Sequence, residues 1–170
     1  MSTIRPRRVV CMGVSGCGKS TLARALSIRL GWAMLEADDF HNDVNRAHMA
    51  SGQPLTEAMR EPWLASVCSA LRARDSDCVL ACSALRRAHR ARLRALGWRT
   101  RFLLLEINPE SARERLQQRS GHFMPASLVD SQFETLEWPL GEVDVSRLDA
   151  RMAPRELLLQ ALIDICVQPH

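Results

Sequence analysis

A glycine-rich loop that ends in a lysine and a serine is the part of this sequence best suited to chemistry. Residues 13–20 read Gly-Val-Ser-Gly-Cys-Gly-Lys-Ser and match the pattern G-x-x-x-x-G-K-[ST] in full. The glycines let the backbone curl so that successive N–H groups point inward, and a helix that follows adds the positive end of its dipole. Lys19, the only lysine in the chain, brings a point charge to the phosphates of a nucleotide, and the hydroxyl of Ser20 can bind Mg²⁺.

The loop therefore predicts a site for ATP and Mg²⁺, with Ser20 as the metal ligand from the protein. A thiol also lies among the loop amides, at Cys17, and both a reactive thiol and a merely tolerated side chain remain open for it. The residues expected to bind the nucleotide are Gly13, Val14, Ser15, Gly16, Cys17, Gly18, Lys19, Ser20 and Thr21.

Carboxylates follow the next apolar run of the chain, at Glu36, Asp38 and Asp39. Ligands of an open parallel sheet bind beyond the carboxyl ends of its strands, which places these groups beside the phosphate loop. One carboxylate there can accept the proton of a substrate hydroxyl or hold Mg²⁺ through water. Adjacent side chains point different ways, so we predict Asp38 as the catalytic base and Asp39 as a helix N-cap.

The third apolar run, residues 78–82, continues into Ser-Ala-Leu and does not end in an aspartate. A GTPase or a motor ATPase would carry an acidic residue at such a position. The absence favours a small-metabolite kinase, in which the acidic residue after the second strand does the work.

An alternation of strands and helices must position these residues. Short apolar runs predict buried strands at 9–12, 33–37, 78–82 and 102–105, with a short fifth strand at 143–145. Helical periodicity and the placement of proline and glycine predict helices at 20–30, 64–71, 86–96, 109–119 and 154–167. The pattern is typical of βαβ units and predicts an α/β fold of the P-loop NTPase type, with three layers and a parallel sheet of about five strands.

Length and composition exclude several classes of protein. A chain of 170 residues with 46% hydrophobic and 25% charged residues is expected to form a single globular domain over 1–170. A net charge of +4 fits either a solvated arginine-rich surface or a basic cleft for an anionic substrate. No dense basic run is interleaved with aromatic residues, so nucleic acid is not expected as a partner.

The cysteines and the apolar runs bear on location. The six cysteines lack the density of a secreted disulfide scaffold and have no zinc-binding spacing, which favours a reducing cytoplasm. No signal peptide is expected at the N-terminus. No stretch of about 18 apolar residues occurs, so no membrane span is expected.

Five separated motifs resemble those of the gluconokinase family and follow in the same order. The first is Asp-x-x-His-x-x-x-Asn-x-x-x-Met-x-x-Gly-x-Pro-Leu at 38–55, and the second is Arg-x-Pro-Trp-Leu at 60–64. The others are Cys-Ser-Ala-Leu-Arg-Arg at 82–87 followed by Arg90, Gly-His-Phe-Met at 121–124, and Ser-Gln-Phe-Glu-x-Leu-Glu-x-Pro at 131–139. The match extends over residues 9–144, which is most of the chain.

This resemblance implies an ATP-dependent transfer of phosphate to the 6-hydroxyl of D-gluconate, giving 6-phosphogluconate. It also implies a fold like that of nucleoside-monophosphate kinases, with a mobile lid at about 119–139, and often a homodimer. Gluconate and ATP are then the expected partners.

The resemblance also implies roles for single residues. A carboxylate is held best by arginine, and hydroxyls need both donors and acceptors. The expected contacts to gluconate are Asp38, His41, Arg60, Arg86, His122 and Gln132. A lid arginine is expected to stabilise the transferring phosphoryl group beside Lys19, with Arg119 as the first choice and Arg115, placed near ATP, as the second.

Departures from the family pattern leave alternatives open. The family usually has glycine at Ala37, proline at Asn42 and lysine at Arg86, and a tyrosine near His89. Another small hydroxy acid, such as shikimate or a related aldonate, is therefore an alternative acceptor. From a different class, a nucleotide-binding regulator or an RNA-binding protein would bind its ligand without turnover.

Overall fold

Five parallel strands form the sheet that carries the site in this computed structural model, which describes residues 6–118 and 125–167. Their order across the sheet is β2-β3-β1-β4-β5, so the strand before the phosphate loop is central. The strands are β1 (Arg7–Met12), β2 (Ala33–Glu36), β3 (Cys78–Ala81), β4 (Arg99–Glu106) and β5 (Val145–Asp149). The predicted parallel sheet of about five strands is confirmed.

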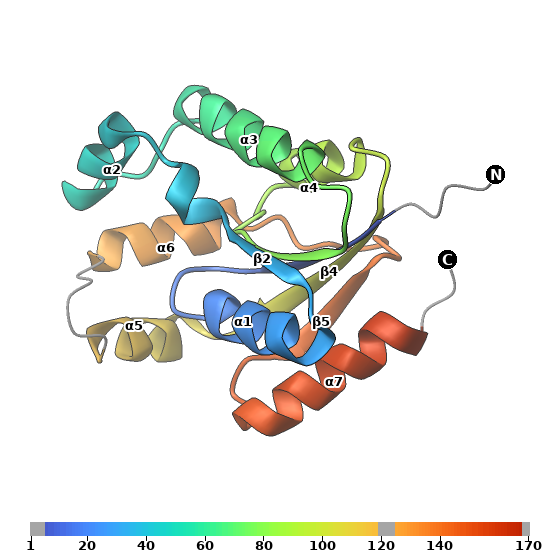
Figure 1. The fold of residues 1–170 in the computed structure, drawn as a ribbon. Coiled ribbons are helices and arrows are strands. Elements are labelled where there is room, and N and C mark those ends of the chain that lie inside the picture. The colour runs from blue at the N-terminus through green and yellow to red at the C-terminus, as the bar shows by residue number, and fades with distance from the viewer. Residues whose placement is uncertain (1–5, 119–124, 168–170) are drawn as a thin grey trace.

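Helices cover both faces of this sheet, with α1 and α7 on one side and α3 and α4 on the other (Figure 1). The helices are α1 (Lys19–Leu30), α2 (Asp43–Ala50), α3 (Glu57–Arg72), α4 (Arg87–Arg94), α5 (Pro109–Gln117), α6 (Ala126–Thr135) and α7 (Pro154–Val167), with a 3₁₀ turn η1 (Ala37–Phe40). This arrangement confirms the three-layer α/β fold. Neither described range contains a helix that is long and apolar enough to cross a membrane.

The central strand shows how the sequence divides the core. Side chains of a strand alternate between the two faces. Val9 and Cys11 therefore pack with Leu26 of α1 in one buried cluster. Val10 and Met12 pack with the α3 residues of a second cluster on the other face. Burial on both faces explains why this strand reads as an uninterrupted apolar run.

Several boundaries differ from the predictions. The fifth strand lies at 145–149 and not at 143–145, because its exposed positions alternate and include Arg147, which makes the run weakly apolar. The helix expected at 64–71 begins at Glu57, where Thr56 caps it by accepting a hydrogen bond from Met59 N–H, and it continues past Pro62. The short helices α2 and α6 were not predicted.

The carboxyl ends of β1, β2 and β3 lead directly into the segments that sequence analysis selected. β1 runs into the phosphate loop, and β2 runs into η1 with Asp38. The N–H of Gly13 donates to the carbonyl of Ser83, which follows β3, at 3.2 Å. This edge of the sheet therefore gathers three sequence-distant segments.

Gly16 and Gly31 offer a matched test of how tightly the loop is packed. Both have positive φ, but a Cβ at Gly16 would lie 2.7 Å from the carbonyl oxygen of Ala112, whereas one at Gly31 meets nothing within 4 Å. We expect Gly31→Ala to lower the free energy of unfolding by about 1–2 kcal/mol, the cost of the left-handed conformation. Gly16→Ala should lower it by at least about 1 kcal/mol more, because a backbone clash adds to that cost.

Urea unfolding of the two variants and the parent protein provides the comparison. Equal losses for both variants would contradict the packing argument, since only Gly16 faces a neighbouring carbonyl.

Candidate active site

A cleft of about 530 Å³ opens at this edge of the sheet. Its walls come from the phosphate loop, from η1, α2 and α3 after β2, from the turn after β3, and from α6. The predicted site residues that line it are Ser15, Gly16, Gly18, Lys19, Ser20, Asp38, His41, Arg60 and Gln132. Residues that were chosen from separate motifs are thus brought together around one space.

The phosphate loop presents an uncompensated positive helix end to the cleft. Gly18 takes φ 101° as the N-cap of α1, and the first turn of that helix contains no acidic residue. Lys19 Nζ folds back and donates to the carbonyl of Val14 at 3.0 Å. The N–H of Ser15 donates to Gln132 Oε1 at 2.6 Å. Each of these groups is held by a neutral oxygen that phosphate oxygens could replace.

Glu36, one of the carboxylates noted after the second apolar run but given no individual role there, lies beside Ser20. Burial raises the pKa of Glu36, and a hydrogen bond with Ser20 and the charge of Lys19 only partly oppose that. A divalent cation near Ser20 would relieve the cost of this half-buried carboxylate, so the oxygen donors present fit Mg²⁺. In residues 6–118 and 125–167, no group of three His, Cys, Asp or Glu side chains is placed to hold a metal ion.

Asp38 stands in the cleft with 79% of its side chain exposed, 3.9 Å from Nε2 of His41. His41 is fixed from behind, because its ring stacks on Trp63 with centroids 4.7 Å apart. Trp63 in turn donates from Nε1 to the carbonyl of Ala37 at 2.8 Å. Burial lowers the pKa of His41, although Asp38 opposes the effect, so the ring is neutral near pH 7.

Asp39 does not cap a helix, contrary to the prediction. It lies inside η1, and the cap of α2 is Asn42, whose side chain accepts a hydrogen bond from the N–H of Asn45. The signal was present in the sequence, since asparagine is as favoured as aspartate at an N-cap.

Two cleft residues, Arg60 and His89, share the half-exposed carboxylate of Glu57. Glu57 accepts from Arg60 Nη1 at 2.5 Å, and its second oxygen lies 3.1 Å from His89 Nε2. Arg86 Nε lies 2.9 Å from the same carboxylate. Burial raises the pKa of Glu57, but the hydrogen bonds of His89 and Arg60 outweigh it and the net direction is downward.

The two arginines that were expected to bind a carboxylate, Arg60 and Arg86, both contact Glu57 but take different positions relative to the cleft. Arg60 and His89 line the cleft, whereas Arg86 contacts Glu57 without being part of the cleft wall. Sequence reasoning missed both Glu57 and His89. Spacing gave no signal for them, because the pair joins α3 to α4 across 32 residues.

The remaining predicted residues lie elsewhere. Arg115 donates to the carbonyls of Cys17 at 3.3 Å and Ala150 at 2.7 Å, and so braces the loop from outside the cleft. The thiol of Cys17 is buried in the core, with 1% of the residue exposed, which disfavours the reading of a reactive thiol. Arg119 and His122 lie outside the described residues.

Comparisons with known proteins agree with this geometry. The family described as "AAA domain" matches residues 9–139. The gluconokinase of Gluconobacter oxydans (strain 621H) is 43% identical over 163 residues, which cover 94% of this chain and 91% of that protein. The solved structure of a gluconokinase from Sinorhizobium meliloti 1021 has a TM-score of 0.85 at 39% identity and covers 94% of this chain and 91% of its own. The solved structure of a sugar kinase from Janibacter sp. HTCC2649 has a TM-score of 0.88 at 40% identity, with 96% of both chains covered.

The two cleft histidines predict how stability depends on pH. Burial lowers the pKa of His41 and of His89 from the ordinary value of 6.5, so each ring binds its proton more weakly in the folded than in the unfolded chain. The stabilisation of the folded state by the neutral rings is therefore fully present at pH values above the ordinary pKa of 6.5, and it is lost as the pH falls through the lowered pKa values. We expect the free energy of unfolding, measured by urea titration, to decrease between about pH 7.5 and about pH 5.

The control is the double variant His41→Gln/His89→Gln, which keeps polar side chains but cannot titrate in this range. Its unfolding free energy should decrease less over the same interval. Identical pH dependence in the two proteins would show that the histidines are not buried in the neutral form.

Proposed function

Because the chain belongs to the gluconokinase family, we propose that it transfers the γ-phosphoryl group of ATP to the 6-hydroxyl of D-gluconate. The observation that carries this proposal is the single cleft that holds the phosphate loop, the exposed carboxylate of Asp38 and the cationic side chain of Arg60. A phosphate-binding loop, a proton acceptor and a group that can bind a sugar-acid carboxylate thus face the same space.

The donor half of the cleft binds the triphosphate. Lys19 exchanges the carbonyl of Val14 for β- and γ-phosphate oxygens, and the loop amides surround the same phosphates. Ser20, with Glu36 beside it, would hold Mg²⁺ together with phosphate oxygens, and the ion would neutralise charge on the phosphates. Arg115 keeps the loop in place through the carbonyl of Cys17, and Arg119 is the proposed lid arginine at the transferring group.

The acceptor half orients the sugar acid. Asp38 accepts the proton of the 6-hydroxyl of gluconate. The oxygen of that hydroxyl forms the new bond to the γ-phosphorus of ATP, and the bond from this phosphorus to the oxygen that leaves with ADP breaks. His41 and Gln132 contact hydroxyls, and Arg60 binds the carboxylate with Arg86 supporting it through Glu57. His122 completes the proposed acceptor contacts. Gln132 also contacts the loop at Ser15, so it lies where donor and acceptor meet.

We also propose a reducing compartment, the cytoplasm, and assembly as a homodimer. Five of the six free cysteines are buried, and such unpaired thiols persist where disulfides are not formed. The homodimer rests on the family resemblance alone.

A substrate panel tests the proposal. ADP release should be measured in a coupled assay with ATP and Mg²⁺ and with gluconate, glucose, shikimate, glycerate or AMP as acceptor. We expect turnover with gluconate, because the cleft combines hydroxyl-binding groups with Arg60. Turnover with another acceptor alone would move the assignment to the alternative hydroxy acids, and ATP binding without any turnover would favour a regulator.

Asp38 and Asp39 form a matched pair for testing the proposed base. Asp38→Asn keeps size and polarity but cannot accept the proton, so kcat with gluconate should fall by about 10²-fold or more. Asp39→Asn, on the adjacent residue of η1, should leave kcat nearly unchanged. Steady-state kinetics of both variants decide the point, and a normal kcat for Asp38→Asn would remove the residue from the chemistry.

A further inference from the structure

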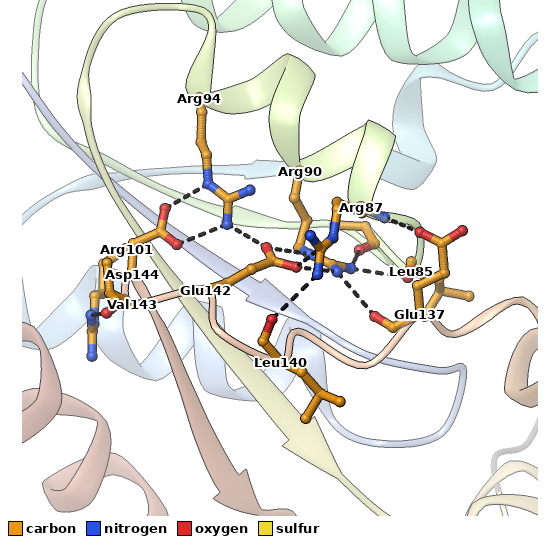
Figure 2. Close-up of polar contacts among 11 residues, drawn as sticks. Leu85, Arg87, Arg90, Arg94, Arg101, Glu137, Leu140, Glu142, Val143 and Asp144 are labelled. Carbon is orange, nitrogen blue, oxygen red and sulfur yellow. Dashed lines mark hydrogen bonds and ion pairs between the residues drawn. The ribbon is translucent and has the colours of Figure 1, made fainter.

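Arg90 of α4 is the most thoroughly buried charge in the described part of the chain, with no exposed surface. Its guanidinium makes five hydrogen bonds (Figure 2). Three go to Glu137 and Glu142, far along the sequence, and two go to Ala84 and Leu85, just before α4. Nε and Nη2 bind Glu142 at 2.9 and 2.6 Å in a bidentate pair. The pKa of Glu142 is lowered to about 2, chiefly by its hydrogen bond with Arg90.

The Nη1 end of the Arg90 guanidinium holds a strained turn of the cleft wall. Nη1 of Arg90 donates to the carbonyls of Ala84 at 3.0 Å and Leu85 at 2.9 Å. Ala84 has φ 42° and is the one non-glycine residue with positive φ in residues 6–118 and 125–167. Such a conformation persists only where surrounding contacts impose it. On either side of it, Ser83 and Leu85 line the cleft.

A third contact ties the same turn to the segment that follows α6. Nη2 of Arg90 donates to the carbonyl of Glu137 at 3.0 Å, while the N–H of Glu137 donates to the carbonyl of Leu85 at 2.9 Å. The carboxylate of Glu137 accepts from the N–H of Arg87 at 2.6 Å. Glu137 stands two residues after the end of α6, the helix that places Gln132 on the phosphate loop.

Arg94 binds the same carboxylate but not the same turn. Its Nη2 donates to Glu142 at 2.5 Å, and its Nε donates to Asp144 at 2.6 Å. Figure 2 shows Arg94 on the far side of Glu142 from Leu85 and Glu137. The network therefore has an inner member, Arg90, that touches the cleft wall, and an outer member that does not.

We propose that Arg90 is a positioning residue for phosphoryl transfer, which fixes the Ala84 turn and the end of α6 against each other. One rigid planar group satisfies both segments, so the acceptor wall and the helix that carries Gln132 keep a single relative placement over the phosphate loop. Arg90 itself touches neither substrate. This inference rests on the proposed gluconate kinase activity.

The test replaces the planar guanidinium of residue 90 but keeps its positive charge. In Arg90→Lys, an ammonium can still pair with Glu142 but cannot reach all five acceptors. With gluconate, kcat/KM should fall by about 10- to 100-fold, the cost of a small misplacement of reacting groups. Water should also reach the phosphate, so that more than one ADP forms per phosphorylated gluconate. ADP binding, measured by calorimetry, should change by less than about twofold because the loop keeps its own contacts.

Two further variants make the result decisive. Arg94→Lys is the matched control, one turn later on α4 with the same partner, and should leave the ADP-to-product ratio at one. Glu137→Ala removes the hydrogen bond from the N–H of Arg87 to the exposed carboxylate of Glu137 and should raise the ADP-to-product ratio by a smaller amount. This variant tests the proposal if Arg90→Lys does not fold. A merely structural role would lower the melting temperature without moving KM or the ratio.

Failure of the two proposals can be told apart. Parent protein that does not phosphorylate gluconate refutes the proposed function. Parent protein that does so, with folded Arg90→Lys and Glu137→Ala that keep the parent's kcat/KM and ratio, refutes the role of Arg90.

Discussion

The phosphate loop takes its shape because its backbone packs against neighbouring backbone without intervening side chains. A Cβ at Gly13 would meet the carbonyl of Leu105 at 2.9 Å, and one at Gly16 would meet that of Ala112 at 2.7 Å. The loop is thus pressed onto β4 and α5. The rest of the site is attached to it, through Ser83 at Gly13 and through Gln132 at Ser15.

Several arginines serve this arrangement through carboxylates that they share. Glu57 gathers Arg60, Arg86 and His89, and Glu142 gathers Arg90 and Arg94. A carboxylate among several cations holds each of them in one orientation, and burial of an arginine is tolerated only when such partners and carbonyls satisfy it. The net charge of +4 alone did not distinguish between a basic surface and a basic cleft, and the structure shows arginines used in the framework as well as at the cleft.

Local signals made the donor half of the site predictable, and long-range contacts made the acceptor half less so. The loop at 13–20, its flanking strand and helix, and the position of Asp38 after β2 follow from sequence periodicity and spacing. Helix α6 carries few strong signals, and its N-cap residue, Pro125, makes no side-chain hydrogen bond to the helix. The contacts of Glu57 and Arg90 were not visible in the sequence, because His89 and Glu142, with which they pair, lie 32 and 52 residues away.

The departures from the family pattern acquire a physical meaning in this structure. Arg86, where the family usually has lysine, and His89, near the usual tyrosine, both contact the carboxylate of Glu57, which also binds Arg60. These two changes thus fall within the one cluster that orients the cleft arginine Arg60, and neither falls on the phosphate loop. Asn42, in place of the usual proline, caps α2, where its side chain satisfies a backbone N–H that would otherwise lack a partner. On the proposed assignment of Arg60 to the acceptor's carboxylate, variation of this kind changes how that carboxylate is presented and leaves the residues of the phosphate loop unaltered.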